Sequence, residues 1–397
     1  MELSSLLTRF SEPETLRMAK LGRELRAKGI DIVDLSLGEP DFNTPEHIKD
    51  AAKRAIDENY SHYTPVPGYA DLRQAVVTKL KRDNNLDYKP EQIVVSTGAK
   101  QAIANVMMAI LEPGKEIIIP TPYWVSYSEI AKVAGGNVNL VRTKARDGFK
   151  ITPEVLEKNI HPNTRLFIFS SPCNPTGAVY SYDELKALAK VFEKHPEVFI
   201  MSDEIYEYID YTGNRHYSFA EFPEIKERVI LINGLSKAFA MTGWRIGYLA
   251  AHVEIAKACE KLQGQFTSGT NAIAQRAAIT ALTAPLTPSF EMVKEFASRR
   301  ERIMELLKET PGFECQAPDG AFYVFPDISF YLGKKFGDNV ISTASDFCMF
   351  LLNEAHVSTV TGSAFGSPEN IRISFANSLK NIEEGFKRIN EKLPLLK

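Results

Sequence analysis

The sequence is poor in the residues that hold disulfide-rich, metal-binding or membrane-spanning proteins together. It has four cysteines and no CxxC pair, which disfavours a disulfide framework or a zinc ribbon and indicates reduced thiols in the cytoplasm. The seven histidines have no metal-ligand spacing, so we expect no bound metal. No apolar run approaches the ~20 residues of a membrane span, and Met1–Phe10 lack the pattern of a secretory signal.

The signature motifs of two large enzyme classes are also missing. The sequence contains neither the GxGxxG of nicotinamide dehydrogenases nor the GxSxG of serine hydrolases. Its net charge of −3 and pI near 6.2 lack the basic excess that a nucleic-acid-binding or polybasic membrane surface needs. The composition, 44% apolar and 24% charged, is typical of a globular chain. A length of 397 residues predicts two domains.

Short, continuous apolar segments alternate with helical stretches through the middle of the chain. The predicted strands are Ile93–Ser96, Glu116–Ile119, Leu166–Phe169, Val198–Met201, Val229–Ile232 and Ile246–Ala250. Continuous rather than alternating apolar runs indicate strands covered on both faces. We therefore predict an α/β fold with a three-layer large domain around a mostly parallel sheet.

The pattern changes near Pro288. A long charged helix over Glu291–Lys308 is followed by strand-like segments at Ala321–Phe325 and Ile371–Phe375, which predicts a smaller α+β domain. We assign residues 46–288 to the large domain, and residues 1–45 with 289–397 to the small one. The pattern of the first 45 residues would also allow them to pack on the large domain.

Two basic residues stand out in the segment Ser236–Tyr248. Lys237 lies just past a predicted strand, where its amine can form a Schiff base with an aldehyde cofactor. Arg245 follows eight residues later, and its planar guanidinium matches phosphate oxygens. Taken singly, Lys237 is more simply explained as a solvated loop lysine, and Arg245 as an arginine in an ordinary salt bridge.

Further candidate residues follow other strands. Asp203 ends one strand, where a carboxylate can pair with a protonated ring nitrogen, and Tyr206 lies three residues on. Asn174 follows another strand in an Asn-Pro-Thr-Gly turn. Gly98 and Ala99 open a helix directly after a strand, which makes an anion site. The purely structural alternatives are a helix cap for Asp203, a simple turn for Asn174 and an ordinary strand–helix junction at Gly98 and Ala99.

Arg372 and Cys173 are weaker candidates by themselves. The apolar residues around Arg372 alternate onto one strand face, so its side chain points to the other face, toward solvent or toward a cleft between the domains. In a cleft it would bind a carboxylate. Cys173 has no histidine nearby in the sequence to activate it, which disfavours a nucleophilic role.

Together these motifs resemble a known family, the fold-type I aminotransferases that use pyridoxal 5′-phosphate (PLP). The resemblance rests on motifs in a fixed order: Gly38–Phe42, Asn174–Gly177, Asp203–Tyr206, Ser236–Lys237 with Arg245, and Arg372. It covers nearly the whole chain. Within class I/II of that family it points to the bacterial aspartate aminotransferases, some of which also use prephenate.

The resemblance implies roles around the cofactor ring. Lys237 would hold PLP as an aldimine and move protons. Asp203 would pair with the pyridine nitrogen, while Asn174 and Tyr206 would bond the phenolic oxygen. Trp124 would stack on the ring. The catalytic residues would be Lys237, Asp203 and Tyr206.

At the phosphate, the resemblance implies Arg245 and the backbone at Ala99 and Lys100. Tyr63 would reach the phosphate from the neighbouring subunit, so the active site would lie at the interface of a homodimer. One departure concerns this end of the site. Many relatives have a phosphate-binding serine three residues before the lysine, where this chain has Gly234, and the role of Ser236 is open.

The resemblance also implies substrate contacts, at Gly38, Trp124, Asn174 and Arg372. A second departure is that no arginine matches the one by which animal-type aspartate enzymes bind the side-chain carboxylate. In the bacterial subgroup a lysine serves instead, at the position of Lys100, assisted by a threonine at that of Thr15. The alternative for Lys100 is an exposed lysine at a helix start, an unfavourable place for a cation unless an anion is near.

The implied reaction is transamination between an amino acid, aspartate first, and a 2-oxo acid. The acceptors would be 2-oxoglutarate or oxaloacetate, with prephenate as a further candidate. The alternatives on the same fold are a C–S lyase and an aminotransferase of aromatic or neutral amino acids. A PLP-binding transcription regulator is disfavoured because the chain has no room for an added DNA-binding domain.

Overall fold

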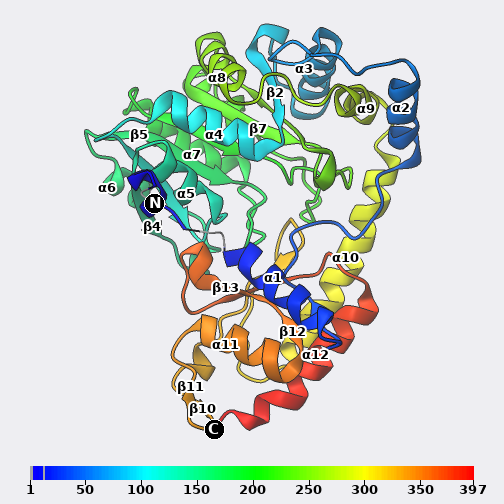
Figure 1. Ribbon diagram of the computed structural model, residues 1–397. Coiled ribbons are helices and arrows are strands. Elements are labelled where there is room, and N and C mark those ends of the chain that lie inside the picture. Colours follow the sequence, from blue (N-terminus) through cyan, green and yellow to red (C-terminus); the bar gives the residue numbers. More distant parts are fainter. Residues whose placement is uncertain (1–2, 12–13) are drawn as a thin grey trace.

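The computed structural model describes residues 3–11 and 14–397 (Figure 1). Its strands are β1 (Val33–Asp34), β2 (Ile93–Thr97), β3 (Glu116–Thr121), β4 (Asn137–Arg142), β5 (Thr164–Ser170), β6 (Phe199–Asp203), β7 (Val229–Gly234), β8 (Ile246–Ala250), β9 (Tyr323–Val324), β10 (Lys335–Phe336), β11 (Asn339–Val340), β12 (Val357–Ser358), β13 (Val360–Thr361) and β14 (Ile371–Ser374).

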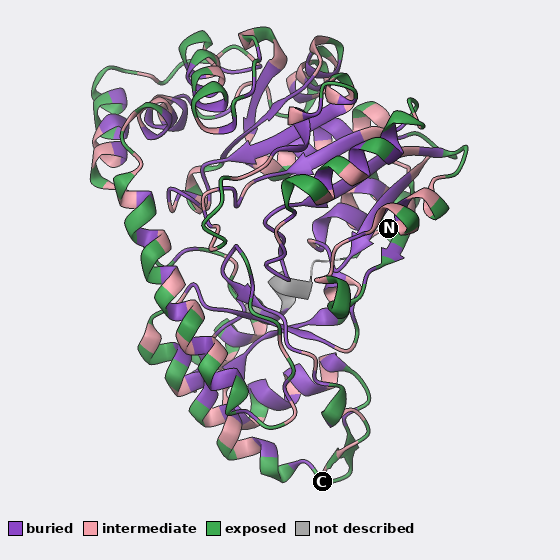
Figure 2. Ribbon diagram, turned by 180° about the vertical axis from the view of Figure 1, so that it is seen from behind, coloured by how far each residue is buried: buried purple, intermediate pink, exposed green. Residues whose placement is uncertain are grey.

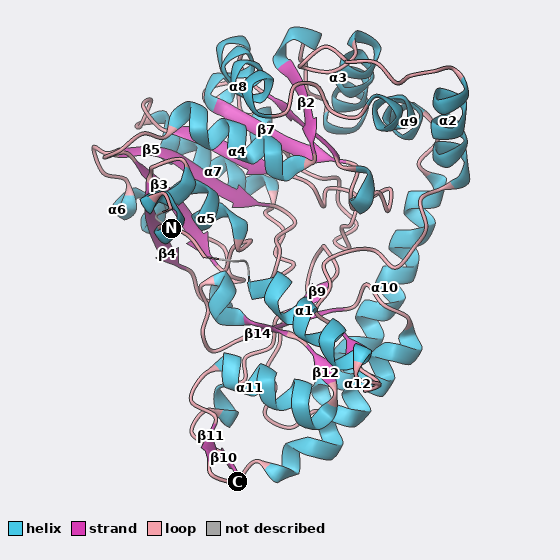
Figure 3. Ribbon diagram, in the orientation of Figure 1, coloured by secondary structure: helices cyan, strands magenta, loops and turns pink. Residues whose placement is uncertain are grey.

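The α-helices surround these strands (Figure 3). They are α1 (Glu14–Ala27), α2 (Glu46–Asp57), α3 (Ala70–Asn84), α4 (Ala99–Ile110), α5 (Ser126–Val133), α6 (Pro153–Asn159), α7 (Tyr182–Glu193), α8 (Val253–Phe266), α9 (Ala272–Thr283), α10 (Thr287–Lys308), α11 (Ala344–Phe350) and α12 (Leu379–Lys392). In the described parts of the chain, no helix combines the length and the hydropathy that crossing a bilayer requires.

A seven-stranded sheet in the order β2-β8-β7-β6-β5-β3-β4 forms the centre of the larger part. All its pairs are parallel except those of β8, which is antiparallel to both β2 and β7. This confirms the predicted α/β fold with a mostly parallel sheet. The sequence pattern does not predict β4, because this edge strand is largely accessible and mixes polar with apolar residues.

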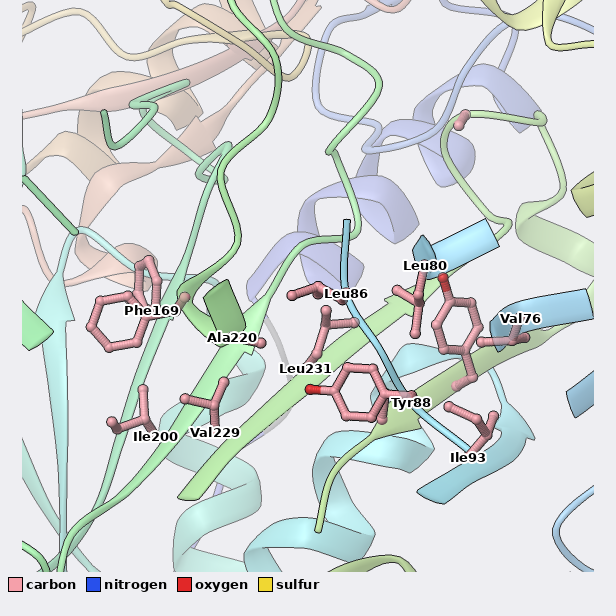
Figure 4. Packing of buried hydrophobic residues seen from close by; sticks show 14 of the residues in the cluster. Val76, Leu80, Leu86, Tyr88, Ile93, Phe169, Ile200, Ala220, Val229 and Leu231 are labelled. Atoms are coloured by element: carbon pink, nitrogen blue, oxygen red, sulfur yellow. The ribbon is translucent and has the colours of Figure 1, made fainter. Parts of the chain in front are cut away.

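The apolar runs are continuous because both faces of the sheet are buried. In β7, Val229 and Leu231 pack into one core cluster with residues of α3, α7 and α9, and Figure 4 shows them with Ile200 on that face. Ile230 and Ile232 pack into another cluster with residues of α4, α5 and α8. Successive strand side chains point to opposite faces. Figure 2 accordingly shows buried strands between helices whose outer faces are exposed.

The other large core lies among α10, α11, α12 and the three-stranded antiparallel sheet β13-β14-β9. Residues near the N-terminus join it: Met18 and Leu35 are buried there, and β1 pairs in parallel with β12. Figure 1 shows α1 lying beside these C-terminal elements. The boundaries after residues 45 and 288 stay a prediction, and α10 runs continuously across the second.

The direction of the strands brings distant residues to one edge. Because β2 and β7 are both antiparallel to β8, they run the same way, and so do β5 and β6. The carboxyl ends of these four strands therefore meet at the edge where β8 begins. Residues that follow β2, β5, β6 and β7, and those that precede β8, converge there.

A buried ion pair between α3 and the segment that follows β6 supports a stability prediction. Nζ of Lys79 lies 2.5 Å from Oε1 of Glu207, and the two side chains are 1% and 4% exposed. Lys79→Met leaves the Glu207 carboxylate buried without its counter-charge, so we expect a loss of about 3–5 kcal/mol of unfolding free energy, measured by urea unfolding followed by circular dichroism.

Lys81→Met on the same helix is the matched control, because its ion pair with Asp87 is exposed. We expect that variant to lose no more than about 1 kcal/mol. Equal losses in the two variants would show that the buried pair does not stabilise the fold as argued.

Candidate functional site

A cavity of about 410 Å³ opens at this edge of the sheet, between the larger part and the smaller core. Its lining comes from segments far apart in the sequence: Ser36, Leu37, Gly38, Glu39, Ala99, Lys100, Trp124, Tyr127, Ser170, Asn174, Asp203, Ile205, Tyr206, Ser236, Lys237, Thr242, Arg245, Tyr323 and Arg372. The cavity is therefore built by the tertiary fold rather than by one local motif.

Asp203 is a buried carboxylate at the end of β6, only 4% exposed. Its Oδ2 accepts a hydrogen bond of 2.6 Å from the Tyr127 hydroxyl, and its Oδ1 accepts one of 3.2 Å from the Ile205 amide. Burial raises the pKa of Asp203 to about 6, while the two hydrogen bonds oppose that rise. The carboxylate is thus held in place and kept available to a cationic partner in the cavity.

Lys237 lies three residues past the end of β7 and projects into the cavity. Its Nζ donates a hydrogen bond of 2.5 Å to the carbonyl oxygen of Gly38. Removal from water, together with the nearby charge of Arg372, lowers the pKa of the Lys237 amine to about 8. An amine with such a pKa is a nucleophile and a proton acceptor near neutral pH.

Arg372 forms the opposite wall, from the middle of β14. Its Nη1 donates to Oδ1 of Asn174 at 3.0 Å, and its Nη2 donates to the carbonyl oxygen of Ser36 at 2.6 Å. The guanidinium carbon lies 4.4 Å from the centre of the Tyr323 ring, and the Tyr323 hydroxyl is 2.8 Å from that of Tyr206. Burial lowers the pKa of Arg372.

Arg372 keeps binding capacity despite these contacts. The side chain is 2% exposed, and its Nε has no hydrogen-bond partner in the described part of the structure. An unpaired buried donor is costly, and a planar guanidinium beside a cavity suits a carboxylate. The sequence allowed Arg372 to point either toward solvent or into a cleft between the domains. The structure places it in the cleft.

A third region of the cavity is an anion cradle at the start of α4. The first amides of a helix have no partner within it, and α4 begins at Ala99 behind Gly98, whose φ is +79°. A Cβ on Gly98 would lie 2.3 Å from Nη2 of Arg245. Arg245 itself directly precedes β8 in the left-handed region, with φ 59°. The backbone is therefore shaped to bring a guanidinium against free amides.

Lys100 lies beside this cradle. Its Nζ is 5.0 Å from the centre of the Trp124 ring, and burial together with the charge of Arg245 lowers its pKa. Two cations at one helix start, with the positive end of the helix dipole, favour an anion in this place. Lys100 is exposed as a residue, so the charge around this helix start, rather than enclosure of the side chain, is what favours an anion beside it.

Gly234 has a packing explanation. It pairs with Gly247 on β8, and a Cβ at residue 234 would come within 2.8 Å of the Ile246 carbonyl oxygen. The close approach of β7 to β8 leaves no room for the serine that many relatives have here. Ser236, by contrast, lines the cavity.

Most residues singled out in the sequence line the cavity: Gly38, Ala99, Lys100, Trp124, Asn174, Asp203, Tyr206, Lys237, Arg245 and Arg372. Tyr63 does not, since its side chain is 99% exposed. Thr15 lies in α1, but its side chain is outside the described residues.

Sequence reasoning missed Tyr127 and Tyr323, which both line the cavity. Tyr127 lies one helical turn after Trp124, and its ring packs edge-on against the tryptophan at 5.4 Å. A spacing of three from a predicted site residue was the available signal. No comparable signal marked Tyr323, because it lies among apolar strand residues that read as core.

Cys173 is buried, and burial raises the pKa of its thiol. Its Sγ lies 3.8 Å from the Pro122 carbonyl oxygen. A buried thiol with a raised pKa is a poor nucleophile, in agreement with the sequence analysis.

A separate group, Glu204, Glu207 and His216, brings three potential metal ligands within 4.8 Å of one another. The ammonium of Lys79 already lies on Glu207, and Nε2 of His216 is 3.0 Å from Oε2 of Glu204. Burial acts to lower the pKa of His216, but the hydrogen bond and charge of Glu204 outweigh it and raise the pKa. The group therefore consists of two buried ion pairs, Lys79 with Glu207 and His216 with Glu204. In each pair the cationic side chain balances the carboxylate without a metal ion.

The lowered pKa of Lys237 has a testable consequence. Only the unprotonated amine attacks an aldehyde, so the rate at which Lys237 reacts with an aromatic aldehyde should rise with pH to a plateau, with a midpoint of about 8. Stopped-flow absorbance followed by peptide mapping would measure this. Exposed Lys190 is the control for non-specific reaction with the aldehyde. A rate at Lys237 that does not change across this pH range would contradict the assignment.

Comparison with known proteins adds to this geometry. The family model described as aminotransferase class I and II matches residues 30–389. A probable aspartate/prephenate aminotransferase of Rhizobium leguminosarum is 44% identical over 98% of this chain and 97% of its own length. An aspartate aminotransferase of Bacillus subtilis is 44% identical, with 98% of each chain covered. The solved structure of an aspartate aminotransferase from Rhizobium meliloti superposes with a TM-score of 0.96 at 40% identity, covering both chains completely.

Proposed function

Because the chain belongs to the class I and II aminotransferase family, whose aspartate aminotransferases depend on PLP, we propose that it transfers the amino group of aspartate to a 2-oxo acid. The proposed acceptors are 2-oxoglutarate and oxaloacetate, with prephenate as a further one. The names of the relatives, aspartate and aspartate/prephenate aminotransferase, support this choice. The observation that carries the proposal is that Lys237, Asp203 and Arg372 line one cavity, where the charges of the other two act on the lysine amine.

The residues of the cavity fit PLP. The cradle of Ala99 amides and Arg245 suits its phosphate, and the close approach of Gly98 to Arg245 supports an anion at this end. Asp203 suits a protonated ring nitrogen, and Trp124 offers a ring face beside it. Lys237 supplies the amine. Bound there, PLP would supply an electron sink for charge that develops at the substrate α-carbon.

Lys237 is the proposed general base and acid. Its side chain lines the cavity, and its pKa of about 8 lets Nζ take and return a proton near neutral pH. The Gly38 carbonyl orients the amine through a hydrogen bond. We propose that Nζ moves the proton at the substrate α-carbon.

Asp203, held by the Tyr127 hydroxyl, is proposed to pair with the ring nitrogen and keep it protonated. Buried negative charge is expensive unless a cation accompanies it, so the pair stabilises both partners. Tyr206 and Asn174 are proposed to hold the ring's phenolic oxygen. Tyr127 is then a positioning residue for Asp203, since its hydroxyl fixes Oδ2 while Oδ1 accepts from the Ile205 amide.

The substrate is proposed to bind through its two carboxylates. Arg372, Asn174 and the backbone at Gly38 would receive the α-carboxylate, at the wall where the Nε of Arg372 is unpaired. Lys100 would receive the side-chain carboxylate, assisted by Thr15. Two cations in one cavity, Lys100 and Arg372, would select a dicarboxylic amino acid.

Tyr63 supports a proposed homodimer. A tyrosine that is 99% exposed has its contact area available to another chain, and we propose that it reaches the phosphate in the partner's cavity.

The proposed location is the cytoplasm. Four scattered cysteines without a CxxC pair suit a reducing compartment.

Replacing the central lysine tests the reaction. Lys237→Ala should lower turnover by about 10³-fold or more and abolish the visible absorbance of the covalently bound cofactor. In the unmodified protein, borohydride reduction followed by peptide mapping should find PLP on Lys237. Lys190→Ala, an exposed lysine elsewhere, is the control and should behave like the unmodified protein. Full activity of Lys237→Ala would overturn the proposal, whereas pyruvate and ammonia from a cysteine conjugate without any oxo acid would indicate a C–S lyase.

Replacing Lys100 tests the substrate. A contact between the ammonium and a carboxylate is worth ~1–3 kcal/mol, so Lys100→Ala should lower kcat/KM for aspartate roughly tenfold to a hundredfold. The value for alanine, which has no side-chain carboxylate, should fall much less. Lys100→Arg keeps the charge and should retain most of the preference. Equal losses for both substrates would remove Lys100 from substrate recognition.

A further inference from the structure

The segment of residues 36–44, here called the strap, lies between β1 in the smaller core and α2, which packs on α9 (Figure 1). Its residues 36–39 line the cavity. Two of its backbone carbonyls meet charged groups of the site. The carbonyl of Ser36 accepts from Nη2 of Arg372 at 2.6 Å, and that of Gly38 accepts from Nζ of Lys237 at 2.5 Å. The position of the strap therefore sets the position of both cations.

The strap is packed closely at this point. A Cβ on Gly38 would lie 2.8 Å from the Tyr323 hydroxyl and 3.9 Å from Nη1 of Arg372. Displacing the backbone by a fraction of that distance would change the contacts of both charged groups. Misplacement on the scale of 1 Å is enough to cost a large factor in a positioned reaction.

The far side of the strap is held by α10. Nη1 of Arg299 donates to Oδ1 of Asp41 at 2.6 Å. The Arg299 guanidinium lies 5.0 Å from the centre of the Phe42 ring and 5.6 Å from that of Phe296, and the two rings meet edge-on at 5.3 Å. Arg299 is 7% exposed as a side chain, yet it does not line the cavity.

The chemistry of this attachment favours arginine. A planar guanidinium can bond a carboxylate at its edge while its flat face packs on an aromatic ring, and a lysine ammonium has no such flat face. The side chain of Asp41 is 29% exposed, so water can replace Arg299 at the carboxylate when the arginine is removed. Loss of Arg299 should then loosen the strap without unfolding the core.

We propose that Arg299 is a positioning residue for the reaction: through its ion pair with Asp41 and its packing on Phe42, it holds the strap so that the Gly38 and Ser36 carbonyls stay on Lys237 and Arg372. The catalytic consequence rests on the proposed function, because that function assigns the α-carboxylate to Arg372. The mechanical consequence does not.

Hydrogen–deuterium exchange of the PLP-loaded protein without substrate tests the mechanical step. In Arg299→Met and Asp41→Asn, the amides of the strap should exchange about tenfold faster or more, while those of β6 and β7 stay unchanged. Arg302→Met is the matched control, because Arg302 lies on the same helix and pairs with Glu383 instead of the strap. If the ion pair is the route, the double variant should be no worse than the worse single one.

Binding and kinetics test the consequence for the site. We expect the affinity for succinate, a non-reacting dicarboxylate measured by calorimetry, and the KM for aspartate each to worsen roughly tenfold in Arg299→Met. We expect kcat to fall as well, because the same strap positions Lys237. Arg299→Lys should recover part of the loss. A merely structural role would lower the thermal midpoint and the yield but leave both constants of the folded enzyme unchanged.

The outcomes separate the two proposals. Faster exchange of the strap with weaker succinate binding supports the role of Arg299. Unchanged exchange, or equal changes in Arg302→Met, overturns it. Absence of transamination by the unmodified protein would refute the proposed function alone, and the exchange and succinate measurements would still decide the role of Arg299.

Discussion

The direction of the strands in the central sheet is the constraint on which the site depends. Asp203 ends β6, Lys237 follows β7, Asn174 follows β5 and the cradle at Ala99 follows β2. These segments are separated by tens of residues in the chain, and they meet only because their strands run the same way. The one reversed strand, β8, adds Arg245, which precedes it and so reaches the same edge.

Burial at that edge gives the charged groups their chemical character. Removal from water raises the pKa of Asp203 to about 6 and lowers the pKa of Lys237 to about 8. Each remains ionisable because partners are supplied: the Tyr127 hydroxyl for the carboxylate and the Gly38 carbonyl for the amine. A site with paired groups of this kind is poised for proton transfer near neutral pH.

The smaller core completes the site from the other side. Arg372 lies on β14, far from the sheet in sequence, and faces Lys237 across the cavity, where its charge contributes to the lowered pKa of the lysine. The strap links this wall to the sheet, with contacts that alternate between the two sides: Ser36 to Arg372, Gly38 to Lys237 and Asp41 to Arg299. The two parts are therefore coupled through a short length of backbone.

The sequence by itself determined the strands whose apolar runs are continuous, the mostly parallel sheet and the residue types at the strand ends, because burial on both faces and the turn after each strand leave local patterns. It did not determine β4, whose exposed edge position permits polar residues, or the roles of Tyr127 and Tyr323, which read as core. Only the tertiary structure decided that Arg372 faces the cavity and that Gly234 leaves no room for a side chain. Both depend on which strand or wall lies opposite, and a chain pattern carries no information about a neighbour that is distant in sequence.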